Sequence, residues 1–223
     1  MNINLDYVKD FLKVFDFSAG LCEEDIPNYA YLLKHEHNIT VKSGVSKLVC
    51  IPPAADYVIK IPFDRYYDEL GDGYSKFERA GILDEKYEWD YCAKEYMLYC
   101  FAETQGIKEA FPETIFLGMI YDWPIYAQEK CTTMAENTTP LKKVSLRQKR
   151  KTCNFCSSKN LINPIDLSWL TLFYNLHGGE NTESFLNFIH YYEIDNDLHC
   201  QNIGFSQKDN RPVIIDFSDF CEY

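Results

Sequence analysis

One short stretch near the end of the sequence limits the folds open to this chain more than any other feature. It begins with the polar run Asp-Leu-His-Cys-Gln-Asn, in which Asn202 follows Asp197 by five residues. Two apolar runs, 202–205 and 212–217, then flank a polar turn, and this pattern predicts a β-hairpin. Such a hairpin would gather Asp197, Asn202 and Asp216 at one edge of a sheet.

Two carboxylates and an amide oxygen at one edge favour a particular chemistry. Hard oxygen ligands suit Mg²⁺, which is usually held by a few protein oxygens together with substrate phosphates. A carboxylate that does not bind metal can accept a proton from an attacking hydroxyl, or orient that hydroxyl. The stretch therefore points to phosphoryl transfer.

The same residues resemble the catalytic-loop pattern D-x-x-x-x-N and the metal motif D-F-G of the protein-kinase-like superfamily. The form Asp-Leu-His-x-x-Asn is similar to the aminoglycoside and choline kinase branch. The resemblance implies that Asp197 is the catalytic Asp and that Asn202 and Asp216 are the metal ligands. It also implies ATP and Mg²⁺ as cofactors and a hydroxyl group, on a small molecule or a protein, as the acceptor.

The sequence departs from the family pattern at several points. Asn196 precedes the catalytic Asp where many protein kinases carry Arg, and the metal motif reads Asp-Phe-Ser. Only seven residues follow Asp216, which leaves no room for an activation segment or for the A-P-E motif. We therefore expect a truncated second lobe and an activity other than that of an ordinary protein kinase.

A lysine in the first half supports the same interpretation. Val58-Ile-Lys60-Ile resembles the V-A-I-K strand, whose Lys neutralises nucleotide phosphates. A lysine inside an apolar strand is costly without a partner, and we expect that partner to be Glu95, with Glu88 as the alternative. The simpler interpretations are a solvent-facing lysine on an edge strand and a surface glutamate.

The remaining nucleotide contacts are less specific. Residues 42–50 stand where the family has G-x-G-x-x-G, but only Gly44 remains, with Ser46 and Lys47 nearby. Small hydroxyls and backbone N–H groups could still approach phosphates there. Glu129, just after the fifth expected strand, falls in the hinge, where backbone groups would bind adenine.

The fold class that we expect is α+β, a two-lobed protein-kinase-like fold with an ATP·Mg²⁺ cleft between lobes at 1–128 and 129–223. The first lobe should be a five-stranded antiparallel sheet with one long helix. Hydrophobic periodicity and turn residues predict an opening helix at 3–16, a break at Asp25–Asn28, strands at 37–43, 46–51, 56–63, 113–121 and 123–128, an exposed loop at 64–84 and a helix at 84–105.

The second half is expected to be mainly helical. Asn163-Pro164 has the form of an N-cap followed by a first-turn proline, so a helix should begin there. It should end at Gly178-Gly179, and Thr182 should cap a further helix that ends near residue 192. Trp89, Tyr96 and Tyr99 fit an aromatic core better than a ligand cage.

Composition excludes several classes of protein. With 46% hydrophobic residues the chain is too apolar to be disordered, and its net charge of −12 disfavours nucleic-acid binding across a broad surface. There is no signal-peptide pattern and no apolar run of membrane-spanning length. The nine cysteines fit reduced thiols in a cytoplasmic protein, while Cys153 and Cys156 have the spacing of zinc ligands.

Three questions stay open at the level of sequence. The basic cluster 142–151 is either a solvated helix face or a docking surface for an acidic partner. His199 is either a neutral, hydrogen-bonded loop residue or a catalytic one. The whole chain is either an active phosphotransferase or a pseudokinase that binds nucleotide or protein, and a protein partner could complete its short second lobe.

Overall fold

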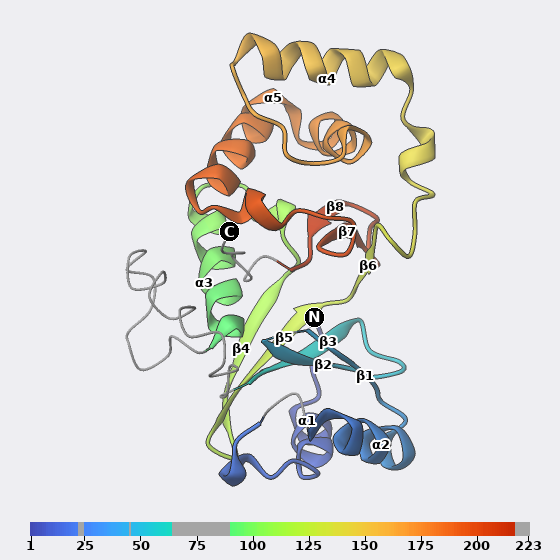
Figure 1. Cartoon of the computed structure of the whole chain (residues 1–223), viewed down its shortest axis with the longest axis vertical. Helices are drawn as coiled ribbons and strands as arrows, with labels where there is room; N and C mark the ends of the chain where they lie inside the picture. The colour runs from blue at the N-terminus through green and yellow to red at the C-terminus, as the bar shows by residue number, and fades with distance from the viewer. Residues whose placement is uncertain (22–24, 45, 64–89, 217–223) are drawn as a thin grey trace. The chain divides into compact units, whose positions relative to one another are not determined.

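The structure is a computed structural model that describes residues 1–21, 25–44, 46–63 and 90–216. The chain forms two compact units (Figure 1). Unit 1 consists of residues 1–97 and 113–129, and unit 2 of residues 98–112 and 130–223. The expected loop at 64–84 and the start of the helix expected at 84–105, with Glu88 and Trp89, lie outside the described residues.

Unit 1 is built on a five-stranded antiparallel sheet in the order β1-β2-β3-β5-β4, which confirms the predicted sheet. Its strands are β1 (Thr40–Ser43), β2 (Lys47–Ile51), β3 (Tyr57–Pro62), β4 (Thr114–Ile120) and β5 (Trp123–Glu129). Each of them falls within or next to a run in which the sequence pattern predicts a strand. β3 is an interior strand that pairs with both β2 and β5.

Two helices precede the sheet, and one of them was not predicted. The opening helix is α1 (Leu5–Leu12), shorter than the predicted 3–16. The expected break at Asp25–Asn28 is wrong, because α2 (Ile26–His37) begins there. Pro27 in the first turn needs no N–H partner, and Asn38 ends the helix in the left-handed conformation at φ 55°.

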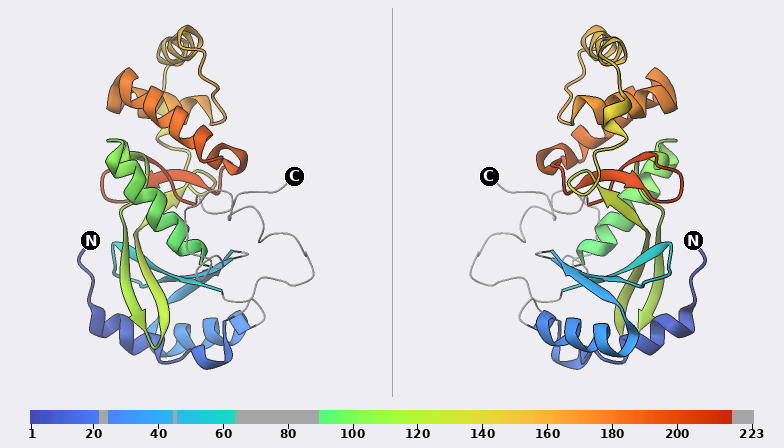
Figure 2. Two further views of the ribbon diagram at one scale, coloured as in Figure 1. Left: turned by 90° about the vertical axis from the view of Figure 1, so that its left-hand side faces the viewer. Right: turned by 90° about the vertical axis from the view of Figure 1, so that its right-hand side faces the viewer.

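The two faces of the sheet carry different side chains because residues along a strand alternate between its faces. Leu48 and Ile61 belong to the apolar cluster that α1 and α2 complete through Val8, Phe11 and other residues. Their strand neighbours Lys47 and Lys60 therefore face the other way. Figure 2 shows α1 and α2 together on one side of the sheet.

Unit 2 holds a small antiparallel sheet in the order β6-β7-β8. Its strands are β6 (Cys131–Thr133), β7 (Ile203–Ser206) and β8 (Pro212–Ile214). The predicted hairpin is confirmed as β7 and β8, whereas β6 was not predicted. Gly204 lies where β7 passes β6 so closely that an added Cβ would overlap the carbonyl oxygen of Thr132.

Three longer helices complete the described chain. They are α3 (Tyr91–Thr104), which contributes to both units, α4 (Leu146–Ser158) and α5 (Leu167–Tyr191). Helix α5 is interrupted at Gly178, with φ 80° and ψ 179°, as the sequence predicts. The shorter 3-10 helices are Phe17–Ala19, Lys108–Ala110, Leu141–Lys143 and Ile194–Asp197.

The caps of α5 differ from those that the sequence predicts. Asp166, not Asn163, caps the helix and accepts hydrogen bonds from the N–H groups of Ser168 and Trp169. Asn163 accepts one from the Ile165 N–H within its own turn. Thr182 is buried inside the helix, where its hydroxyl donates to the Gly178 carbonyl at 2.7 Å.

The cysteines of the described segments are all free thiols. Cys50, Cys92 and Cys156 are buried, while Cys153 and Cys200 are exposed. Within the same segments, no cluster of three or more His, Cys, Asp or Glu side chains is suited to a metal ion. Nor is any described helix both long and apolar enough to cross a membrane.

Candidate functional site

Three buried charged side chains lie close together in unit 1, between the sheet and the first turns of α3. Lys60 Nζ lies 2.6 Å from Glu95 Oε2, and Lys47 Nζ lies 2.9 Å from Glu95 Oε1. Lys47, Lys60 and Glu95 are 1%, 3% and 0% exposed. We call these three side chains the lysine–glutamate cluster.

Strand pairing explains why two lysines reach one carboxylate. In the β2–β3 ladder Lys60 is opposite Val49, and Lys47 is opposite Pro62, two residues further along β3. The two lysines therefore lie on the same face of adjacent strands. Gln128 on β5 extends the network, since its Nε2 lies 3.5 Å from Glu95 Oε2 and 3.3 Å from Thr114 Oγ1.

The Lys60–Glu95 ion pair that the sequence predicts is present. The alternative of a solvent-facing edge lysine is wrong, because β3 is an interior strand and Lys60 is buried. The second lysine on the same carboxylate was not predicted, since the sequence pattern placed Lys47 only in the phosphate-covering loop. Side chains alternate between the two faces of a strand, so Lys47 can be placed on the face of Lys60 only when the register of β2 against β3 is known.

A buried acid lies at the start of α3. Asp90 Oδ1 accepts from the Ala93 N–H at 2.8 Å, and Oδ2 accepts from the Tyr126 hydroxyl at 2.6 Å. Burial raises the pKa of Asp90 to about 6. This pair was not predicted either. It fixes the first turn of α3 to β5 and so supports the position of Glu95 one turn later.

Gly44, Ser46 and Lys47, which the sequence predicts to approach phosphates, lie at the tip of the β1–β2 hairpin. The Gly44 N–H donates to the Lys47 carbonyl at 3.0 Å, and the Phe63 N–H donates to the Ser46 carbonyl at 3.0 Å. Ser46 is 1% exposed. The N–H of Glu129, the residue predicted for the hinge, donates to the Glu113 carbonyl at 2.8 Å, so it is already hydrogen-bonded within the chain.

The predicted metal ligands meet in unit 2 through the backbone. The Asn202 carbonyl accepts from the N–H groups of Ile215 and Asp216, at 2.7 and 3.4 Å. Asn202 and Asp216 are therefore adjacent, although fourteen residues separate them in the sequence. Asn202 is 9% exposed. Phe217, of the expected Asp-Phe-Ser motif, lies outside the described residues.

The loop before β7 is held by its own backbone. Asp197 ends the 3-10 helix Ile194–Asp197. The N–H groups of Asn202 and Ile203 donate to the His199 carbonyl, at 3.0 and 3.2 Å. The Gln201 N–H donates to His199 Nδ1 at 3.2 Å. This contact fits the alternative in which His199 is a hydrogen-bonded loop residue.

Comparisons with known proteins add little to these observations. No family model matches the chain, and no curated protein matches it. Among solved structures, the streptomycin–ATP–APH(2")-IIa ternary complex is similar over 89% of this chain and 72% of that chain, with 18% identity and a TM-score of 0.34. The function must therefore be inferred from the residues of this chain.

Proposed function

We propose that the protein is an ATP- and Mg²⁺-dependent phosphotransferase that acts on a hydroxyl acceptor. The observation that carries this proposal is the lysine–glutamate cluster, in which Glu95 holds two buried ammonium groups within 3 Å. Burying such charges costs several kcal/mol per ion. Because stability alone does not require buried lysines at this cost, we infer that their positive charges serve a function.

Nucleotide phosphates are the ligand that we assign to the cluster. Its two ammonium groups lie in a chain of net charge −12, so they offer an anion a local positive contact that the surface as a whole does not. Lys60 would contact the phosphates, and Glu95 would position it. Catalysis of phosphoryl transfer consists largely of such positioning and charge neutralisation.

Asn202 and Asp216 fit an Mg²⁺ ion by their chemistry. They present an amide oxygen and a carboxylate, and the backbone places them side by side. Mg²⁺ is usually bound by one or two carboxylates together with substrate phosphates. A bound Mg²⁺ would neutralise charge on the phosphates, and Asp197 would accept or orient the proton of the acceptor hydroxyl.

A second candidate is nucleotide binding without phosphoryl transfer. The hairpin tip favours it, because the Gly44 N–H is used by the Lys47 carbonyl and Ser46 is buried. This hairpin therefore offers phosphates fewer N–H and hydroxyl donors than a glycine-rich loop would. Such a site could bind ATP and still fail to align it for transfer.

Thermal shift and ADP release, measured with ATP and Mg²⁺, separate the two candidates. The variants are Lys60→Met and Asp216→Asn, with Lys34→Met and Asp6→Asn as controls on the exposed faces of α2 and α1. We expect ATP·Mg²⁺ to stabilise the wild type and the controls and to be turned over by them. Each site variant should lose turnover, and in Asp216→Asn the thermal shift produced by ATP should no longer depend on Mg²⁺.

The other outcomes are equally informative. A nucleotide-dependent shift without ADP release from the wild type would support the second candidate. Absence of any shift at millimolar ATP·Mg²⁺ would contradict both. If Lys60→Met abolished turnover while Asp216→Asn left it intact, the assignment of Asp216 would be wrong.

A further inference from the structure

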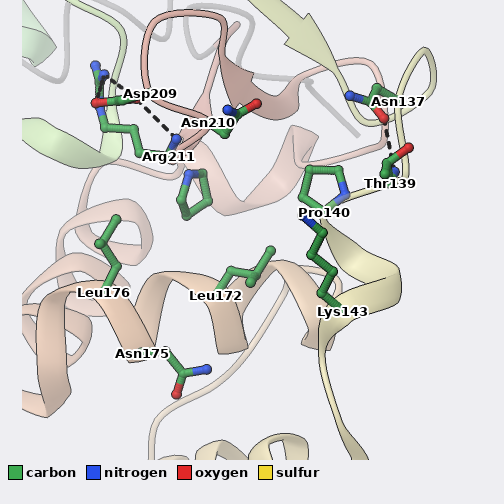
Figure 3. A pocket seen from close by; sticks show the side chains of 11 residues that line it. Asn137, Thr139, Pro140, Lys143, Leu172, Asn175, Leu176, Asp209, Asn210 and Arg211 are labelled. Carbon is green, nitrogen blue, oxygen red and sulfur yellow. Dashed lines mark hydrogen bonds and ion pairs between the residues drawn. The ribbon is translucent and has the colours of Figure 1, made fainter.

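Unit 2 contains a groove that none of the residues of the proposed phosphotransferase site lines. Its volume is about 500 Å³. Helix α5 forms one side, the turn between β7 and β8 forms the opposite side, and the segment 137–143 closes a third (Figure 3). This volume falls within the range of pockets that hold small ligands or anchor side chains.

The floor of the groove is apolar. Leu172 and Leu176 are one helical turn apart and therefore share a face of α5, and Pro140 and Pro212 also line the groove. Figure 3 shows both leucine side chains directed from α5 toward the β7–β8 turn. Leu176 is 59% exposed. A single exposed leucine is ordinary, but this set forms a recess suited to an apolar side chain.

The walls of the groove are held in place by hydrogen bonds. Arg211 donates to the carbonyls of Glu109 and Phe111, at 3.2 and 3.4 Å, and to the Asp209 carboxylate at 3.2 Å. On the other side, Asn137 Oδ1 accepts from the Thr139 N–H at 2.9 Å. A preformed groove spends little free energy on ordering when it binds.

One side of the groove is positively charged. Lys143 lines it, and its exposed neighbour Lys142 begins a stretch, 142–159, with seven Lys and Arg residues and no Asp or Glu. Of this stretch, Lys143 lines the groove. Arg211 lies within 3.5 Å of the carboxylates of both Asp209 and Glu109, so the charge that the groove offers an occupant comes from Lys143. In a chain of net charge −12, this charge favours an acidic occupant.

We infer that the groove docks a short segment of a partner protein in which a leucine-like side chain is flanked by acidic residues. The apolar side chain would fill the recess above Leu172 and Leu176, and the acidic residues would face Lys143. A membrane fits less well, since the leucines lie in a recess between two walls. The inference does not depend on the proposed phosphotransferase activity.

Selection from a displayed library of random peptides, with the full-length chain as bait, tests this inference. We expect the enriched peptides to combine Leu, Ile or Met with neighbouring Asp or Glu. Their affinities, measured by fluorescence anisotropy, should fall about tenfold or more in Leu176→Asn, because the variant places a polar amide where the apolar side chain of the peptide would be buried. They should also fall in Lys143→Glu and at high salt.

The controls distinguish a variant that does not fold from one that folds but no longer binds the peptide. Leu176 and Lys143 are exposed, so both variants should retain the wild-type circular dichroism spectrum, and Lys9→Glu on α1 should bind as the wild type does. The inference is overturned if no peptide is enriched, or if the enriched peptides bind Leu176→Asn and Lys143→Glu normally. Binding to phosphatidylserine vesicles that Leu176→Asn abolishes would overturn it in favour of a membrane.

Discussion

Replacing Glu95 with Gln tests whether the lysine–glutamate cluster depends on the carboxylate charge. At an effective dielectric constant of about 20, each ammonium–carboxylate contact at 2.6–2.9 Å represents a gross attraction of roughly 6 kcal/mol. The net contribution is much smaller because three charges have lost their water. Loss of the carboxylate alone leaves both lysines buried and unneutralised by it, so we expect Glu95→Gln to lower the free energy of unfolding by about 3–5 kcal/mol.

A matched control lies on the same helix. Glu103 of α3 pairs with Lys108 at the same 2.6 Å, but the two side chains are 55% and 43% exposed. Glu103→Gln should therefore cost less than about 1 kcal/mol. Urea unfolding followed by circular dichroism measures both variants at neutral pH. Equal losses for the two variants would refute the reasoning, because the shortest distances match while Glu95 is buried and contacts two lysines.

A rescue experiment sharpens the same test. Adding Lys47→Met and Lys60→Met to Glu95→Gln removes the two buried ammonium groups while keeping their chain length. Apolar replacements of a whole buried ion cluster are often neutral or stabilising, so the triple variant should be more stable than Glu95→Gln alone. If it is less stable, the cost lies in packing rather than in charge.

Three further predictions concern stability. Because burial raises the pKa of Asp90 to about 6, the folded state should lose stability as the pH rises from about 4 to about 6, and Asp90→Asn should gain roughly 2–3 kcal/mol on the wild type over that interval in urea titrations. Gly178→Ala forces an alanine into φ 80° and should cost about 1–3 kcal/mol by thermal unfolding, whereas Gly44→Ala should cost less because the φ of Gly44 is not positive. Gly204→Ala would place a methyl group against the Thr132 carbonyl, so hydrogen exchange should show loss of protection along β6 and β7; unchanged protection would contradict the close approach.

The strands of the five-stranded sheet, the β7–β8 hairpin and the helices α3 and α5 were predictable because their signals are local. Short β-prone apolar runs such as those of β2 and β3, bounded by Gly44 and the prolines after Ile51, indicate a strand without any knowledge of its neighbours. Helix α2 was missed for the same kind of reason. Pro27 is a chain breaker in most contexts and a good residue in a first turn, and its immediate neighbours do not decide between the two.

The candidate site was only partly predictable because its contacts join distant residues. The cost of burying Lys60 implied a carboxylate partner, and the long helix offered Glu95. The second ammonium group at that carboxylate depends on the register that places Lys47 beside Lys60, and no residue near Lys47 encodes this register. The same holds for Asp90 and Tyr126, which are thirty-six residues apart.

The distribution of thiols gives the protein a set of intrinsic reporters. Cys50 and Cys92 are buried in unit 1, where burial raises the pKa of each thiol, while Cys153 and Cys200 of unit 2 are exposed. Alkylation in native buffer should therefore modify Cys153 and Cys200 first, and it should reach Cys50 and Cys92 only when unit 1 opens. The two labelling rates, read by mass spectrometry, then follow the opening of unit 1 without any engineered probe.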